Sequence, residues 1–416
     1  MKNWQTMKLK DVCQRITVGH VGSMASEYKD SGIPFLRSLN ITPFRLSKRE
    51  LKFIDKKFHD RLKKSALKPG DVAVVRTGYP GTACVIPKEL GEANCSDLVL
   101  ITPGSELNPH FLAAIFNSTF GKNLVGGNLV GAAQQHFNIT TAKELKLLLP
   151  PKQIQDKIAA ILTAYDDLIE TNKRRIALLE KMAEEIYREW FVRLRFPGYQ
   201  NTQFIKGIPE GWEYTSINTF SKFKYGYTES AVQDNELPKF LRVTDINKSS
   251  YIDWSNVPNC PIDENELIKY TLGLHDIVIA RMADPGQIAI MEDSISAVFA
   301  SYLIKIDYDR SKITPYYLFY TLSMDSLLEY FRGANSGSTR GSINAQLIGK
   351  TKILKPSFSI QSKFEDLVLP IRNQLFTLLQ SNQTLTKTRD LLLPRLISGK
   401  LPVEHLDIQT PPSMNP

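Results

Sequence analysis

The chain has 416 residues, which is too long for one ordinary hydrophobic core and predicts two or three domains. A hydrophobic content of 42% and a charged content of 23% are typical of a folded, water-soluble protein and exclude a mainly disordered chain. Lys and Arg number 52 against 43 Asp and Glu, and the net charge of +9 favours a polyanionic partner such as nucleic acid, although such a charge can also serve solubility alone.

The amino-terminal segment MKNWQTMKLKDVCQ lacks the apolar run of a signal peptide, and no later run is long enough to cross a membrane. The four cysteines form no Cys-x-x-Cys pair and cluster with no histidine. We therefore expect no zinc site and no disulfide framework, and a soluble protein of the reducing cytoplasm.

A basic cluster lies between residues 45 and 64. Lys and Arg side chains close to phosphates release counterions and give affinity without sequence preference. We expect phosphate contacts here, and the alternative is a solvated helix face. The candidate residues are Arg45, Lys48, Arg49, Lys56 and Lys57.

Residues 67–86 read LKPGDVAVVRTGYPGTACVI, a pattern that predicts a strand, a turn and a second strand. Arg76 ends the first of these strands. It either contacts a ligand or fastens the turn to an acid such as Asp71, and we favour the structural role.

The strand-like DLVLIT, the helical NPHFLAAIFNSTF and a loop rich in Gly and Asn follow. Reading a base sequence requires Arg, Gln or Asn side chains that are presented to base edges. Gln134, Gln135 and His136 on this loop are the candidates, and the alternative is a loop without a ligand.

After Pro150 and Pro151 the apolar residues step by four and three, which predicts a helix over 152–194 that spans roughly 65 Å. One extra four-residue step near Asn172 is a stutter in a heptad seam. The expected seam positions are Ile154, Ile158, Ile161, Tyr165, Leu168, Asn172, Ile176, Leu179, Ala183, Ile186 and Trp190.

The whole pattern then recurs. Residues 272–291 read LGLHDIVIARMADPGQIAIM, at an offset of 205 from the first copy, so that Arg281 and Asp276 repeat Arg76 and Asp71. After one inserted residue the offset is 206, which carries Gln155 onto Gln361. A register that survives along the chain with one slip indicates a tandem duplication.

The second copy of the Gly-rich loop, GANSGSTRGS, keeps its glycines and changes its polar residues. Two modules that share a scaffold and differ at their loops would read different sequences. The candidates in this copy are Asn335, Ser338, Thr339 and Arg340.

A second long helix needs burial for its apolar stripe, and it can pack antiparallel on the first helix as a coiled coil. Pro370 within it predicts a kink, or a short helix that leads into a longer one. The alternative is two modules on a flexible string. The stripe consists of Ile360, Phe364, Leu367, Ile371, Leu375, Leu378, Leu385, Leu392 and Leu396.

The expected fold class is mixed α/β (α+β), a tandem duplication of a globular domain plus a long helix. The expected parts are a first mixed domain over 1–150, a long helix over 151–196, a second mixed domain over 197–356, a second long helix over 357–402 and a disordered tail over 403–416.

Motifs of catalysis are missing from the sequence. It contains no Gly-x-x-x-x-Gly-Lys-Ser/Thr loop, no Gly-x-Gly-x-x-Gly after a strand and no Asn/Asp-Pro-Pro-aromatic motif. The Glu-x-Lys tripeptides at Glu50 and Glu144 are interpreted as surface charge. These observations favour a binding module, and no catalytic or metal-binding residue is expected.

With its two GDVAVVRTGYPG-like turns, its GSTRGSIN loop, and helices that begin LLLPPKQIQDKI and end LLEKMAEEIYREWF or LTKTRDLLLPRLISGKL, the chain resembles the specificity subunits of type I restriction–modification systems. The resemblance covers nearly the whole length. It departs at Ile154 and Ile360, where the family often has Glu before Gln.

The resemblance implies a non-catalytic subunit whose two mixed domains, the target-recognition domains, each read one half of a split site in double-stranded DNA. The helices would set the spacing and dock two methyltransferase subunits, through which two motor–nuclease subunits could join. No cofactor is expected on this chain, whereas S-adenosylmethionine, ATP and Mg²⁺ belong to the partners. The alternatives are a self-contained DNA-modifying or DNA-cleaving enzyme with diverged motifs, and a coiled-coil scaffold.

Overall fold

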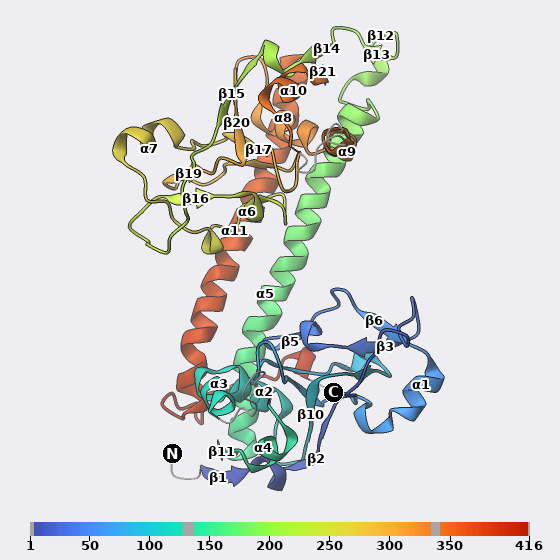
Figure 1. Cartoon of the computed structure of the whole chain (residues 1–416), viewed down its shortest axis with the longest axis vertical. Helices are drawn as coiled ribbons and strands as arrows, with labels where there is room; N and C mark the ends of the chain where they lie inside the picture. Colours follow the sequence, from blue (N-terminus) through green and yellow to red (C-terminus); the bar gives the residue numbers. More distant parts are fainter. Residues whose placement is uncertain (1–3, 128–136, 334–341, 415–416) are drawn as a thin grey trace. The chain divides into compact units, whose positions relative to one another are not determined.

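The computed structural model describes residues 4–127, 137–333 and 342–414 (Figure 1). The chain divides into two compact units, and the boundary between them falls within each of the two long helices. Unit 1 comprises Met1–Arg174 and Leu378–Pro416, and unit 2 comprises Arg175–Thr377. Within the described ranges, no helix has the length and apolar character needed to cross a membrane.

The centre of unit 1 is a four-stranded antiparallel sheet in the order β2 (Cys13–Val18), β10 (Leu98–Pro103), β7 (Val72–Val75) and β8 (Ala83–Val85). Both faces of this sheet are covered: Val72 and Val74 join one hydrophobic core, and Ala73 and Val75 join another. A strand that is buried on both faces needs an uninterrupted apolar run, which explains the segment VAVV.

Helix α2 (Pro109–Asn117) covers one face of this sheet, through the core that contains Val72, Val74 and Phe111. Asn108 caps the helix by accepting a hydrogen bond from the Phe111 N–H at 3.0 Å. The other elements of unit 1 are β1 (Gln5–Lys8), β3 (Ile33–Leu36), β4 (Ile41–Thr42), β5 (Arg45–Leu46), β6 (Lys52–Ile54), α1 (Lys56–Arg61), β9 (Asn94–Cys95), α3 (Thr119–Gly126), α4 (Ile139–Glu144) and β11 (Lys146–Leu149).

Unit 2 repeats this plan. Its four-stranded sheet has the equivalent order β15 (Ser221–Tyr225), β20 (Leu303–Tyr308), β17 (Ile277–Ala280) and β18 (Ile288–Ile290). The parallel pair β3 with β9 recurs as β16 (Lys239–Leu241) with β19 (Ala297–Phe299), and β1 with β11 recurs as β14 (Glu213–Ser216) with β21 (Lys352–Lys355). The predicted mixed fold with a tandem duplication is confirmed.

Among the residues that the structure describes, unit 2 also contains two short strands and five short α-helices. They are β12 (Phe204–Ile205), β13 (Ile208–Pro209), α6 (Val243–Ile246), α7 (Glu264–Tyr270), α8 (Pro315–Leu322), α9 (Asp325–Gly333) and α10 (Ala345–Lys350).

The two long helices are α5 (Lys152–Tyr187), which continues as a π-helical turn over Arg188–Val192, and α11 (Phe358–Ile397). Pro370 lies inside α11 without ending it, so the expected short helix leading into a longer one is wrong. Only one backbone hydrogen bond depends on the N–H that proline lacks, and neighbours of Pro370 such as Val368 and Ile371 remain buried.

The two helices run antiparallel within unit 1. Asn172 donates a hydrogen bond to Asn382 at 3.0 Å, and Arg389 forms a 2.5 Å ion pair with Asp166, so that rising numbers on one helix meet falling numbers on the other. Asn172 is buried at the predicted stutter. Interdigitation of side chains as in a coiled coil stays a prediction.

One position of the predicted seam is wrong on each helix. Leu168 is 53% exposed while its neighbour Ile169 is buried, and Leu367 is exposed while Val368 is buried. In α5, the buried Asp166 paired with Arg389 takes the place beside Ile169 in the interface. The seam thus shifts by one residue at Ile169, and a buried ion pair lies beside it at a position that apolar spacing does not include.

A buried glutamine lies in the first turn of each long helix. Gln155 accepts a hydrogen bond from the Asn108 N–H at 3.0 Å and donates one to the Pro150 carbonyl at 2.9 Å. Gln361 does the same with the Thr314 N–H and the Pro356 carbonyl, both at 3.0 Å. The repeated glutamine thus fastens the start of each helix to the mixed domain before it.

The residues after α11 pack on unit 1, although a disordered tail is expected there from the sequence. Val403 is buried, and Ile408 and Met414 contact the same hydrophobic core as α2. Lys157 of α5 donates hydrogen bonds to the carbonyls of Glu404 and Leu406, both at 2.8 Å. These contacts order the tail as far as residue 414.

Candidate nucleic-acid interface

The β7–β8 turn and the end of the Gly-rich loop are joined through Arg76. Its backbone carbonyl accepts a hydrogen bond from the Phe137 N–H at 3.2 Å, and its guanidinium donates to the Phe137 carbonyl at 3.1 Å. The Arg76 side chain is only 15% exposed. These contacts support the structural role that the sequence favours for this arginine.

The second copy has the same joint. The Arg281 carbonyl accepts a hydrogen bond from the Ile343 N–H at 2.9 Å, and its guanidinium lies 4.9 Å from the centre of the Tyr225 ring. Gly81 and Gly286 both adopt positive φ, at 91° and 92°. Each domain therefore carries one tight turn and one loop end, which meet at an arginine.

The acids expected to hold these arginines have other partners. Asp71 is fully buried and forms a 2.5 Å ion pair with Arg15, and Asp276 forms a 2.5 Å ion pair with Lys305. Arg76 instead has Asp97 at 3.5 Å. The suggested acid partners are wrong, because both aspartates sit at the opposite end of the strand from the arginine.

The predicted base-contacting residues of both Gly-rich loops lie outside the described residues. They are Gln134, Gln135 and His136 in the first domain, and Asn335, Ser338, Thr339 and Arg340 in the second. On the carboxyl-terminal side of the loops, the described chain resumes at Phe137 and at Ser342, which precedes Ile343.

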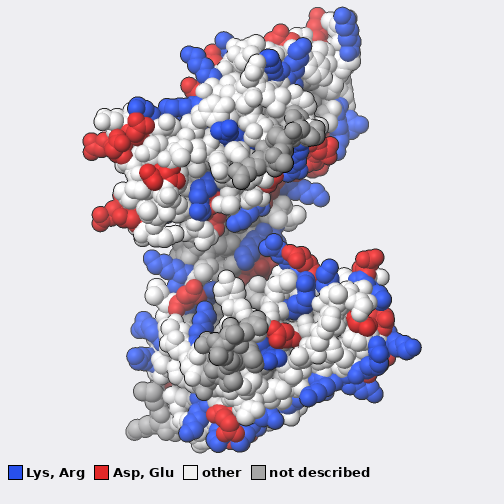
Figure 2. All heavy atoms as spheres, viewed as in Figure 1, with Lys and Arg blue, Asp and Glu red and all other residues white. Residues whose placement is uncertain are grey.

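The predicted phosphate contacts separate into two groups. Arg45 is half-buried and pairs with Asp167 of α5 at 2.9 Å, so its charge is already matched. Lys48, Arg49, Lys56 and Lys57 are exposed. Figure 2 shows Lys and Arg side chains gathered along the edge of unit 1 that carries α1.

Two neighbouring lysines at the start of α1 differ in their surroundings. Lys56 pairs with Glu92 at 2.8 Å, and this hydrogen bond raises the pKa of its ammonium group. Lys57 has no ion pair with any residue that the structure describes. Its charge is therefore the more available of the two for a phosphate.

The tip of the β7–β8 turn carries a residue that the sequence analysis missed. Tyr79 is 84% exposed, the highest exposure among the large hydrophobic side chains of the described ranges. An aromatic residue between Gly78 and Pro80, with no aromatic residue at the equivalent position in the second copy, is the signal that could have identified it.

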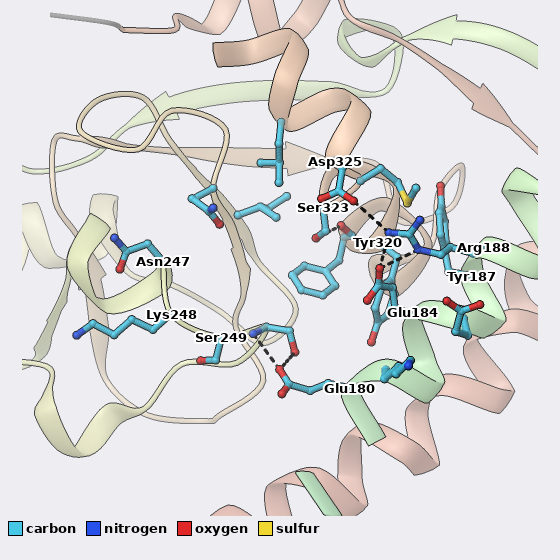
Figure 3. A pocket seen from close by; sticks show the side chains of 18 of the residues that line it. Glu180, Glu184, Tyr187, Arg188, Asn247, Lys248, Ser249, Tyr320, Ser323 and Asp325 are labelled. Carbon is cyan, nitrogen blue, oxygen red and sulfur yellow. Dashed lines mark hydrogen bonds and ion pairs between the residues drawn. The ribbon is translucent and has the colours of Figure 1, made fainter. Parts of the chain in front are cut away.

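Unit 2 contains a cavity of about 690 Å³, lined by the α5 face around Glu180, Glu184 and Arg188 (Figure 3). Several of its charged groups have partners within the lining. Arg188 donates to Glu184 at 2.8 Å and lies 3.3 Å from Asp325, and Glu180 accepts a hydrogen bond from the Ser250 hydroxyl at 2.6 Å. These pairs fasten α5 to the loop that follows α6 and to α9.

The cysteine thiols of the described ranges are poor nucleophiles. Burial raises the pKa of the Cys13 and Cys84 thiols to about 12 and that of Cys260 to about 11, which keeps them protonated at neutral pH. No cluster of three His, Cys, Asp or Glu residues suited to a metal ion occurs among those same residues.

Comparison with known proteins agrees with this arrangement. Residues 1–181 match the family model of the type I restriction modification DNA specificity domain. The MjaIX specificity subunit of a type I restriction enzyme from Methanocaldococcus jannaschii is 26% identical, covering 97% of this chain and 95% of that protein. The HindI specificity subunit from Haemophilus influenzae is 22% identical, covering 81% and 88%.

A crystal structure of a type I restriction–modification S subunit from M. genitalium has the same fold, with a TM-score of 0.59, 16% identity and coverage of 95% of this chain and 96% of that one. The resemblance to specificity subunits that the sequence motifs carry is confirmed.

Proposed function

We propose that this chain, a relative of the specificity subunits of type I restriction–modification systems, selects the DNA sequences on which partner subunits act. The observation that supports the proposal most strongly is the duplicated domain. In each copy an arginine, Arg76 or Arg281, joins a tight turn to the end of a Gly-rich loop. A mobility-shift measurement with the methyltransferase partner tests it. Tighter binding to the cognate duplex than to random DNA is expected, and equal affinity at moderate salt would contradict the proposal.

Each mixed domain reads one half of a bipartite target. In support, the frames have the same strand order, while the residues that the loops present differ between the copies. Direct readout depends on which donor and acceptor groups face the base edges. We assign this readout to Gln134, Gln135 and His136 in the first domain, and to Asn335, Ser338, Thr339 and Arg340 in the second.

Phosphate contacts of the first domain come from exposed Lys and Arg side chains between β5 and the start of α1. Lys48, Arg49 and Lys57 project from the surface of unit 1, and Lys56 shares its charge with Glu92. Such contacts position a protein on the duplex without reading its sequence. Arg45 is removed from this set because its guanidinium pairs with Asp167.

The long helices set the distance between the half-sites and dock two methyltransferase subunits, through which two motor–nuclease subunits can join. The helix starts are held firmly by Gln155 and Gln361, as a ruler requires. Inserting seven residues into α5 adds roughly 10 Å, or about three base pairs. Sequencing of methylated sites should show a longer gap, and an unchanged gap would mean that the helix is not the ruler.

A further inference from the structure

Tyr79 stands at the tip of a turn whose backbone is held by hydrogen bonds. The Gly81 N–H bonds to the Val75 carbonyl at 3.0 Å, and the Thr82 N–H bonds to the Tyr79 carbonyl at 3.2 Å. Thr77 fastens the base of the turn through a short hydrogen bond to Asp97. The turn therefore holds its tip residue in one place while the ring extends into solvent.

Single exposed aromatic side chains are common on protein surfaces, so exposure alone is weak evidence for a binding role. The position of Tyr79 is stronger evidence. Its turn is fastened to the end of the Gly-rich loop through the two hydrogen bonds between Arg76 and Phe137, at 3.1 and 3.2 Å. The ring thus projects from a turn that is joined to Phe137, the first described residue after that loop.

The second domain treats the equivalent tip differently. Asp284 stands where Tyr79 stands in the first copy, and its carboxylate is tied to Arg332 of α9 at 3.0 Å. The same turn therefore exposes the Tyr79 ring in the first copy, and in the second copy it holds Asp284 in an ion pair. An aromatic ring can pack against bases, whereas the Asp284 carboxylate is already engaged by Arg332 and offers no such contact.

We propose that the Tyr79 ring packs against a base or sugar of the half-site that the first domain reads, and so contributes to specificity for that half alone. This inference rests on the proposed function. Apolar contact with a thymine methyl group, or partial insertion between base pairs, is open to such a ring. The packing face of the ring, and not the hydroxyl group, supplies the affinity.

The experiment uses the full chain assembled with its methyltransferase partner and a fluorescent duplex that carries the methylated sequence. Tyr79→Ala is expected to weaken binding roughly tenfold, as loss of an aromatic–base contact does. Tyr79→Phe, which retains the ring, should bind within about twofold of the wild-type complex. Thermal unfolding of each complex confirms that the variants are folded.

Two controls locate the effect. Tyr214→Ala removes another exposed tyrosine, 62% exposed on β14 in unit 2, and should leave binding unchanged. The difference between wild type and Tyr79→Ala should persist on a duplex whose second half is scrambled, and it should vanish when the first half is scrambled.

The outcomes distinguish a failure of the Tyr79 inference from a failure of the proposed function. A wild-type complex that binds all sequences equally would contradict the proposed function itself. A sequence-specific wild-type complex that Tyr79→Ala matches in affinity would overturn the role of Tyr79 alone. Equal losses for Tyr79→Phe and Tyr79→Ala would also overturn it, because the contact would then belong to the hydroxyl group.

Discussion

Arg372 of α11 donates hydrogen bonds to both carboxylate oxygens of Glu292, and the two side chains are only 1% and 3% exposed. The guanidinium also bonds to the Ser250 hydroxyl at 2.8 Å, and the Tyr316 hydroxyl donates to Glu292 at 2.8 Å. This buried pair ties the long helix to two loops of the second mixed domain.

Removing one member of the pair should destabilise the chain strongly. Arg372→Met leaves the Glu292 carboxylate buried without its cation, and the expected loss is about 3–5 kcal/mol in the free energy of unfolding. The double variant Arg372→Met/Glu292→Leu should recover much of that loss, since no unpaired charge remains. Urea unfolding of the three proteins measures this, and a double variant less stable than Arg372→Met would contradict the explanation.

The glutamine at each helix start should matter more than its exposed neighbour. Gln155→Ala leaves the Asn108 N–H and the Pro150 carbonyl buried without partners, with an expected cost of about 1–3 kcal/mol. Gln153→Ala, at an exposed position of the same helix turn, should change stability by less than about 0.5 kcal/mol. Similar losses for both variants in urea unfolding would mean that the buried glutamine is not a fastening point.

Local features of the fold are readable from the sequence, because each depends on residues close together in the chain. The run VAVV and the turn at Pro80–Gly81 both act over a few residues, and their recurrence at a constant offset reveals the duplication. The glutamines at the helix starts repeat too, but the N–H groups that they accept from lie 47 residues away, so spacing alone does not show these bonds.

The features of the fold and site that cannot be predicted from the sequence depend on contacts between residues far apart in the chain. Arg372 reads as a charged side chain on the polar side of a helix, yet its partner 80 residues away buries it. Neighbouring apolar residues such as Leu168 and Ile169 are distinguished only by what packs against them. In the candidate site, Arg45 and Lys57 look alike in sequence, and only the fold pairs one of them with Asp167.

Acid should weaken the fold through His110. Burial lowers the pKa of its imidazole to about 4, while the Asp167 carboxylate acts in the opposite direction. An unfolded histidine titrates near about 6.5. Between these values the unfolded chain binds a proton that the folded chain does not, so stability is lost as the pH falls from about 6.5 to about 4.

The variant His110→Gln cannot take up that proton. It should lose less stability than the wild-type chain between pH 7 and pH 4.5, as measured by urea unfolding at both values. Equal losses would show that His110 does not contribute to the pH dependence.

The adjacent lysines of α1 allow a matched test of phosphate contact. Lys57→Gln should reduce the slope of log affinity against log salt concentration by about 1, because one phosphate contact is lost. Lys56→Gln should change the slope less, since Glu92 already neutralises much of that charge. Titrations of the assembled complex on cognate and random DNA measure both slopes, and a larger change for Lys56→Gln would contradict the assignment.

The most direct test of the account is an exchange of residues 1–150 for the equivalent domain of a relative with a different target. Methylated sites are then sequenced in cells that carry the exchanged chain and its methyltransferase. The account predicts that one half of the recognised sequence changes while the other half and the gap are retained. A change in both halves, or in neither, would contradict a chain built from two independent DNA-reading domains.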